Sequence, residues 1–204
     1  MKKRINTPVF RLAVILPAII LLAAACRSNE TPKPHAYFRM SFPEKEYQIY
    51  DAQCPFTFEF PVYGKIVPVE NHSDEPCLFN ISFPAYKGTI HLTYKEIKGD
   101  LDDFLEDDWT FVFKKIAQRA DAVDMHHYSD SDRKVYATVY DIKGNAASPV
   151  QFFVTDSVRN FLRGSLYFAV QPNYDSLEPA IVFFRKDIIH IVESVKWNSG
   201  QIKN

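Results

Sequence analysis

Short segments in which apolar and polar residues alternate recur along most of this chain, and they constrain its fold more than any other feature. The clearest is Gly88 to Ile97 (GTIHLTYKEI), where β-branched and aromatic residues occupy alternate positions. Successive side chains of a strand point to opposite faces, so such a segment predicts a strand with one buried face. The same pattern predicts further strands over residues 46–51, 56–60, 65–70, 78–83, 133–142, 150–155 and 161–170.

Two longer segments have the three- and four-residue spacing of amphipathic helices. They cover residues 100–117, with Asp100 as the expected cap, and residues 176–197, with Ser176 as the expected cap. The order of strands, helix, strands and helix predicts an α+β domain, a mostly antiparallel sheet with two packed helices. This order resembles the sandwich of the PsbP and Mog1 proteins. The expected buried stripes are Leu101, Leu105, Trp109, Val112 and Ile116, and Leu177, Ile181, Phe184, Ile188, Ile191 and Val195.

The first 25 residues are typical of a leader for export. Basic residues precede an apolar run from Leu12 to Ala25, and its 14 residues are fewer than the roughly 20 that span a bilayer. Three alanines then precede Cys26, which suits a lipoprotein signal peptidase: small side chains, then a thiol that can carry a diacylglyceryl group. We expect a lipoprotein signal peptide over residues 1–25, a lipidated Cys26, and a tether over residues 26–37. An ordinary secretory leader with a chance cysteine is the alternative.

The chain that follows the leader has 179 residues, with 20 Lys and Arg against 25 Asp and Glu. This length suits one well-buried domain, which we place at residues 38–204. The net charge of −5 gives no reason to expect nucleic acid as a partner, and the sequence contains no basic stripe.

Cys54 and Cys77 begin two segments with the same plan, CPFTFEFP and CLFNISFP. Assigning Cys26 to lipid leaves these two as an even pair in an exported protein, where disulfides persist. We therefore predict a disulfide between them, which contributes about 3.4 kcal/mol on the chain-entropy model. Such a bridge favours strands that lie parallel or meet at a corner over an antiparallel hairpin. Two buried free thiols are the alternative.

No group of residues predicts a catalytic, cofactor or metal site, so we expect a protein that is not an enzyme. Asp124, His126 and His127 stand close together, but adjacent side chains of an extended segment point to opposite faces. We expect surface histidines in a loop there. The acidic residues of the first helix lack the spacing and the glycine of a calcium loop, and they predict a solvated face. They are Asp102, Asp103, Glu106, Asp107 and Asp108.

Two stretches are long and unusual: TPKPHAYFRMSFPEKEYQIYDAQCPFTFEFP (Thr31 to Pro61) and GNAASPVQFFVTDSVRNFLRGSLYF (Gly144 to Phe168). CLFNISFPAYKGTIHLTYKEI, DLDDFLEDDWTFVFKK, PNYDSLEPAIVFF and DIIHIVESVKW belong with them. Together these stretches resemble the gliding-motility lipoprotein D (GldD) family of Bacteroidetes. The resemblance covers nearly all of the chain after the leader.

The resemblance implies a lipoprotein needed for movement over surfaces and linked to the type 9 secretion machinery, with no known catalytic activity or cofactor. We expect a membrane-anchored, non-enzymatic component that contacts other gliding-motility and type 9 secretion envelope proteins. Arg27, directly after the cysteine, and the few acids that follow favour an outer-membrane location facing the periplasm. A periplasmic carrier of a lipid or glycan is the alternative, and it should show a closed apolar cavity.

The segment Asn145, Ala146, Ala147, Ser148 and Pro149 lies between two predicted strands, so we expect an exposed connection. Its small side chains would let another backbone approach closely. The fixed φ of Pro149 would reduce the entropy lost on docking. We predict part of a partner-binding surface here, and a plain hairpin loop is the alternative.

Overall fold

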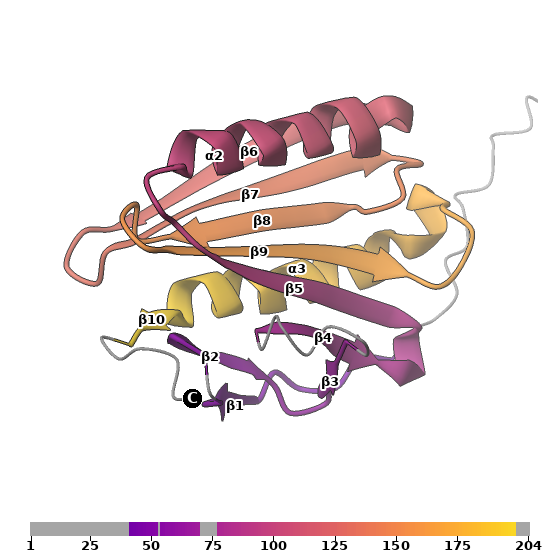
Figure 1. Ribbon diagram of the computed structural model, residues 1–204. Coiled ribbons are helices and arrows are strands. Elements are labelled where there is room, and N and C mark those ends of the chain that lie inside the picture. The colour runs from indigo at the N-terminus through magenta and orange to yellow at the C-terminus, as the bar shows by residue number, and fades with distance from the viewer. Residues whose placement is uncertain (1–40, 53, 70–76, 199–204) are drawn as a thin grey trace, which may run out of the picture. The chain divides into compact units, whose positions relative to one another are not determined.

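The structure is a computed structural model that describes residues 41–52, 54–69 and 77–198. Its largest element is an antiparallel sheet with the strand order β3–β4–β5–β9–β8–β7–β6, and a smaller sheet has the order β1–β2–β10 (Figure 1). The strands are β1 (Tyr47–Tyr50), β2 (Phe56–Pro61), β3 (Lys65–Pro68), β4 (Leu78–Phe83), β5 (Gly88–Glu96), β6 (Ala120–Asp130), β7 (Val135–Gly144), β8 (Val150–Thr155), β9 (Asn160–Phe168) and β10 (Lys196–Trp197).

Two long helices cover opposite faces of the large sheet (Figure 1). On β7, Val139 belongs to the core that contains α3, whereas its neighbour Tyr140 packs with Val112 of the other helical layer. Because side chains alternate along a strand, the two helices lie on opposite sides. The predicted α+β class is therefore confirmed. The helices are α2 (Leu101–Thr110), which continues as the π-helix η2 (Phe111–Ile116), α3 (Tyr174–Ser194), and the short 3₁₀ helices η1 (Pro84–Tyr86) and η3 (Ala117–Arg119).

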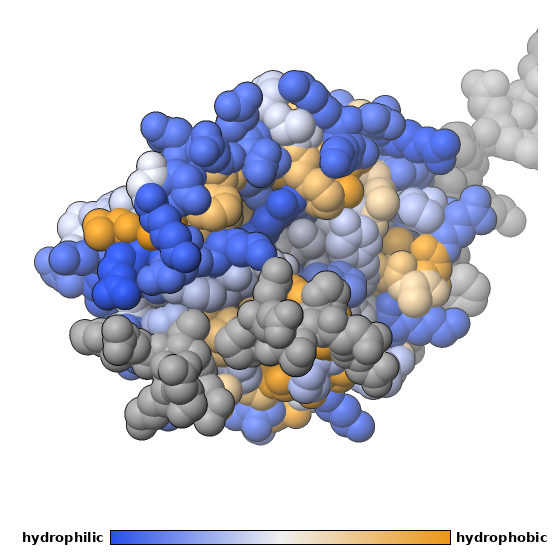
Figure 2. All heavy atoms as spheres, in the orientation of Figure 1, coloured by the Kyte–Doolittle hydropathy of each residue, from blue (hydrophilic) through white to orange (hydrophobic). Residues whose placement is uncertain are grey.

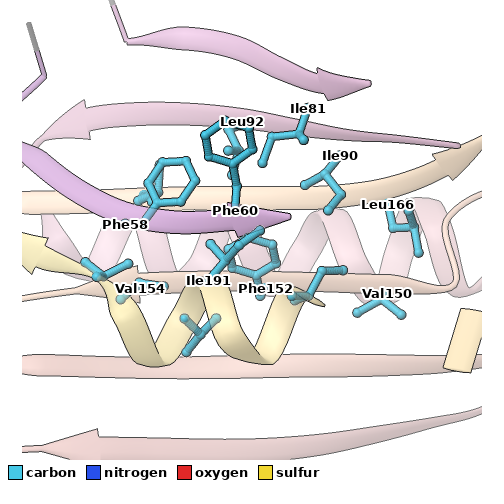
Figure 3. Close-up of a cluster of buried hydrophobic side chains, with 14 of the residues drawn as sticks. Phe58, Phe60, Ile81, Ile90, Leu92, Val150, Phe152, Val154, Leu166 and Ile191 are labelled. Atoms are coloured by element: carbon cyan, nitrogen blue, oxygen red, sulfur yellow. The ribbon is translucent and has the colours of Figure 1, made fainter. Parts of the chain in front are cut away.

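The main core lies between the large sheet, α3 and β2. Phe58 and Phe60 of β2, Phe152 of β8 and Ile191 of α3 project into one cluster of buried side chains (Figure 3). Each large apolar side chain that is buried in this way contributes about 1.5–3 kcal/mol. The alternation predicted for β2 and β8 is what brings these aromatic rings to one face.

A disulfide joins Cys54 and Cys77, whose Cα atoms lie 5.7 Å apart. Cys54 precedes β2 in the small sheet and Cys77 precedes β4 in the large sheet, so the bridge ties the two sheets together. β2 and β4 do not pair as a hairpin. Both cysteines are buried in the main core.

A buried carboxylate fastens the first described residues to α3. Asp187 is fully buried, and it lies 2.7 Å from Nζ of Lys45. It also accepts hydrogen bonds from the hydroxyls of Tyr47 at 3.1 Å and Tyr63 at 2.7 Å. Burial, and then the charge of Asp187, raises the pKa of Tyr47 to about 12. This network therefore holds β1 against α3.

The strand β6 is absent from the sequence prediction, and the expectation of a loop at His126 and His127 is wrong. Among the described strands, β6 lies at the edge of the large sheet and pairs with β7 alone. Most of its residues are exposed, so it lacks the buried face that produces an alternating pattern. Backbone hydrogen bonds to β7 hold it in place instead.

The first helix is rotated relative to the prediction. Trp109, expected in the buried stripe, is 48% exposed, whereas Asp108, expected on the solvated face, is 1% exposed. The physical reason is an opposite charge beneath the helix, because Arg163 of β9 meets the Asp108 carboxylate.

The second helix begins earlier than predicted. Asn173 is its cap, and the Asn173 side chain accepts a hydrogen bond from the backbone N–H of Ser176. Ser176 therefore lies within the first turn and is not the cap. At the other end the chain leaves the helix at Val195, and Trp197 pairs with Phe56 in the small sheet.

Candidate functional site

The sheet face beneath α2 carries a row of polar side chains that crosses five strands. Asn80 of β4 pairs in register with His91 of β5, and His91 pairs with Ser165 of β9. The row continues from Ser165 to Gln151 of β8 and Tyr140 of β7. Residues in register on neighbouring strands lie side by side on one face. Strand pairing thus assembles this polar row from positions far apart in the sequence.

Between α2 and this face lies a groove of about 410 Å³, which we call the α2 groove. In Figure 2 hydrophilic side chains cover the outer side of the α2 layer, and only small apolar patches show beneath them. The floor of the α2 groove consists of His91, Thr93, Lys95, Arg163, Ser165 and Tyr167. Its walls consist of Phe104, Asp107, Phe111 and Phe161.

A buried ion pair lies under the groove. Nε of Arg163 is 3.1 Å from Oδ1 of Asp108, and the two side chains are 25% and 1% exposed. The guanidinium also lies over the ring of Phe111, with its Cζ 4.0 Å from the ring centroid, which is a cation–π contact. Helical spacing places Asp108 one turn from Phe104 and Val112 on the inward side. Arg163 is therefore held between a carboxylate and an aromatic ring.

Several buried polar atoms beside the ion pair have no hydrogen-bond partner among the described residues. They are Nη2 of Arg163 and both side-chain amide atoms of Gln151, whereas the Asp108 carboxylate has Arg163 and the Tyr140 hydroxyl beside it. Leaving a buried polar group unsatisfied costs about 1–3 kcal/mol, so most buried polar groups of folded proteins have a hydrogen-bond partner. The π-helical turn that begins at Phe111 is also a geometry found frequently at functional sites.

Burial raises the pKa of the Asp108 carboxyl above its usual range, while the charge of Arg163 and the Tyr140 hydroxyl act in the opposite direction. A carboxyl group that a cleft shifts in this way, next to one specific cation, is a common signature of a functional site. The ion pair therefore joins α2 to β9 beneath the groove.

We expect Asp108→Asn to raise the melting temperature by a few degrees at neutral pH. The pKa of Asp108 is raised in the folded state, so its stabilising contribution is present below its ordinary value of 3.8 and is lost as the pH rises through the folded-state pKa. Asparagine has the same shape and no charge to bury, and its amide oxygen can still accept a hydrogen bond from Nε of Arg163. Thermal unfolding over a range of pH should show the two proteins converging in acid. A lower melting temperature for the variant at neutral pH would show that Arg163 requires the carboxylate.

The other titratable groups of the floor are a histidine, a tyrosine and a lysine. Nδ1 of His91 lies 2.7 Å from Oδ1 of Asn80, and the His91 ring packs edge-on against Tyr167 with centroids 5.3 Å apart. An amide oxygen only accepts, so Nδ1 carries the proton. Burial lowers the pKa of His91 and raises the pKa of Tyr167, so both are uncharged near pH 7. Arg163 and Lys95 are then the two cations of the floor.

The two histidines that the sequence brought together lie apart in the structure. Nε2 of His126 is 3.0 Å from Oδ2 of Asp141, whereas Nδ1 of His127 is 3.0 Å from Oγ1 of Thr138 on the other face of the sheet. Within residues 41–52, 54–69 and 77–198, no three His, Cys, Asp or Glu side chains are grouped so that they could hold a metal ion. Neither long helix in this part of the chain has the length and apolar character of a membrane span.

The segment proposed for partner binding connects β7 and β8, and it is only partly exposed. Ala146, Ser148 and Pro149 are buried, so the expectation of a fully exposed connection is wrong. Asn145 is exposed and its Oδ1 accepts a hydrogen bond from the backbone N–H of Tyr174 at 3.1 Å. Ala147 is exposed at the rim of a small depression. The depression is lined mainly by apolar residues, which include Pro149, Val170, Pro172, Leu177 and Ile181.

The leader over residues 1–25, Cys26 and the tether over residues 26–37 lie outside the described residues. Within the described residues, the sequence did not predict the ion pair under the groove. Strand alternation does place Arg163, Ser165 and Tyr167 on one face, and a glutamine inside the apolar run of β8 is a second signal. No local pattern distinguishes Asp108 from the other acids of α2, because its partner is a residue of β9.

The chain matches the family model described as "Gliding motility lipoprotein GldD" over residues 27–197, which is most of its length. The chain belongs to this family. A GldD-family chain is a lipoprotein related to gliding motility and anchored in the cell envelope.

One solved structure that the comparison found is the solution structure of cyanobacterial PsbP (CyanoP) from Synechocystis sp. PCC 6803. It shares 12% sequence identity with this GldD-family chain and has a TM-score of 0.46. The similarity covers 76% of this chain and 94% of that chain. The comparison with curated protein sequences found no match.

Proposed function

We propose that this GldD-family lipoprotein acts by binding another envelope protein of the gliding-motility and type 9 secretion apparatus, and that it catalyses no reaction. The observation that carries this is the α2 groove, where hydrogen-bond donors and aromatic rings line one recess. Such a lining suits binding.

The proposed organisation places a signal peptide at residues 1–25, a lipidated Cys26 with a tether over residues 26–37, and one domain at residues 38–204. The family match begins at residue 27, directly after the cysteine, which supports this division. We place the protein in the outer membrane, facing the periplasm. Membrane fractionation combined with protease treatment of intact cells tests this, because a surface-exposed protein would be degraded.

Complementation of a deletion strain tests the binding role. Wild-type protein should restore gliding and secretion and should co-purify with envelope proteins of the apparatus. Variants of the α2 groove that remain folded should lose both. A folded protein with an altered groove that still restores movement and keeps its partners would place the binding surface elsewhere.

We expect Cys26→Ser to abolish membrane anchoring. A serine hydroxyl cannot take the place of the thiol that carries the diacylglyceryl group, and acyl chains supply the membrane affinity of a lipoprotein. Intact-protein mass spectrometry should show a wild-type form that begins at Cys26 with added acyl mass and a variant without it. Ser28→Ala, two residues away, is the control and should behave like wild type. A Cys26→Ser protein that is processed and stays with membranes would refute lipidation.

A second contact surface is proposed at the β7–β8 connection, where Ala147 borders the apolar depression. We expect Ala147→Trp to change stability by less than about 0.5 kcal/mol, because the side chain is exposed. If this rim contacts a partner, the variant should fail to restore gliding. Val158→Trp, in the exposed β8–β9 connection, is the matched control. Full function of a stable Ala147→Trp protein would leave only a plain hairpin loop.

The competing function is a periplasmic carrier of a lipid or glycan, and the volume of the α2 groove is the observation that favours it. A bound ligand stabilises a folded protein in proportion to the logarithm of its concentration over Kd. A panel of lipids and glycans should therefore leave the melting temperature unchanged if the protein binds only protein partners. A rise of several degrees with one of them would support the carrier.

A further inference from the structure

We propose that the α2 groove binds an extended polypeptide segment that presents a carboxylate to Arg163 and Lys95 and an apolar side chain to Phe104 and Phe111. This inference rests on the proposed binding function and adds the chemistry of the partner. The proposed ligand is a segment of another protein. It combines an acidic residue with an aromatic or a large aliphatic residue.

The carboxylate follows from the donors of the floor. Nε of Arg163 lies against Asp108, and the Arg163 side chain, which is 25% exposed, lines the α2 groove. Phe111 and Asp108 hold the guanidinium in one orientation, so little side-chain entropy is lost when a ligand arrives. Thr93 is the register partner of Arg163, and Lys95 lies two residues further along the same face of β5. A planar guanidinium beside an ammonium group suits a carboxylate acceptor.

A single carboxylate fits better than a polyanion. The exposed side of α2 carries Asp102, Asp103 and Glu106, and Asp107 lines the groove itself. These acids would repel a chain of like charges, such as a nucleic acid or the surface of an anionic membrane. A single carboxylate can pass between these acids and reach Arg163 and Lys95. The acidic rim therefore selects against the densely charged alternatives.

The apolar side chain follows from the walls. Phe104 and Phe111 are only half-buried, although Phe104 stacks on Phe161 with ring centroids 5.4 Å apart. Their partly exposed rings stand directly beside the cationic floor. A segment with an acidic residue next to a large apolar residue would contact both the cations of the floor and the aromatic walls. A hydrophilic acidic segment would contact only the cations.

Binding of peptides to the full chain, purified in detergent, tests the inference. The probe is an array of hexapeptides in which two neighbouring positions are varied over all amino acids. We expect peptides with Asp or Glu beside an aromatic or large aliphatic residue to bind best. Exchanging Glu for Gln in the best peptide should weaken binding by about tenfold or more, because a charge-assisted hydrogen bond becomes a neutral one.

Two groove variants and one control complete the experiment. Arg163→Lys keeps the charge against Asp108 but loses the planar fork, so affinity should fall by about tenfold. Lys95→Gln should weaken binding by a smaller factor. Lys143→Gln is the control, since Lys143 pairs with Asp124 on the opposite face of the sheet, and it should bind like wild type. Thermal unfolding of each variant separates lost binding from lost folding.

Several results would overturn the inference. These are the absence of bound peptides, selection of peptides without an acid, or equal loss of binding in Lys143→Gln. Binding to phosphatidylglycerol vesicles that falls in the groove variants would replace the peptide with a lipid. The proposed function is tested separately: if the groove variants restore gliding while Cys26→Ser does not, the ligand assignment fails and the anchored role stands.

Discussion

Replacing Asp187 by alanine should lower the free energy of unfolding by about 3–5 kcal/mol. Asp187 is fully buried. It forms an ion pair with the ammonium group of Lys45 and accepts hydrogen bonds from the hydroxyls of Tyr47 and Tyr63. Alanine would leave these donors without their acceptor in a poorly solvated place. Nζ of Lys45 would keep the hydroxyl and ring of Tyr63, the Phe183 carbonyl and the face of the Phe183 ring. Urea unfolding measures the loss.

Two measurements distinguish the loss of this network from a general effect of mutating α3. Glu193→Ala removes an exposed carboxylate from the same helix and should change stability by less than about 0.5 kcal/mol. In Asp187→Ala the amide protons of β1 should exchange faster, because Tyr47 loses its tie to the helix. Unchanged exchange in β1 would mean that the network does not hold this strand.

Replacing Gly164 by alanine should destabilise the protein by about 3 kcal/mol. Gly164 of β9 lies in register with Phe152 of β8 and Leu92 of β5, both fully buried. A Cβ at this position would overlap the Phe152 ring and would lie 3.0 Å from Cδ2 of Leu92. Phe152 cannot move away, because the main core surrounds it (Figure 3).

A neighbouring glycine provides the control for Gly164→Ala. A Cβ at Gly88 would meet its nearest atom, Cε1 of Phe168, at 3.4 Å, which is ordinary contact. Gly88→Ala should therefore change stability by less than about 1 kcal/mol. Adding Phe152→Leu to Gly164→Ala should recover part of the loss, since the smaller side chain makes room. A double variant that is as unstable as the sum of the two single variants would contradict this packing.

Local patterns predicted the strands that have one buried face. β4 and β5 begin and end within one residue of their predicted bounds, because buried and more exposed residues alternate along the sequence of each strand. The same rule explains the failure at β6. Edge strands with both faces exposed carry no such alternation, and only pairing with β7 shows that residues 120–130 are extended.

The phase and ends of the helices needed information from other elements. Trp109 and Asp108 both fit a helix face in sequence, and Arg163 decides which one points inward. Asn173 and Ser176 are both suitable caps, and the side chain of Asn173 is the one that accepts a backbone hydrogen bond. Such choices depend on contacts between residues that are far apart, or on geometry finer than periodicity.

The sequence by itself determined the α+β class, the strands with buried alternation and the approximate position of both helices, because each depends on the spacing of neighbouring residues. It also carried the resemblance that the family match then established. Tertiary structure alone decided the α2 groove. Asp108, Gln151 and Arg163 come from α2, β8 and β9, and their meeting depends on strand order and register. A charge buried beneath a helix is stable only when its partner is supplied across that interface, and no local pattern contains that partner.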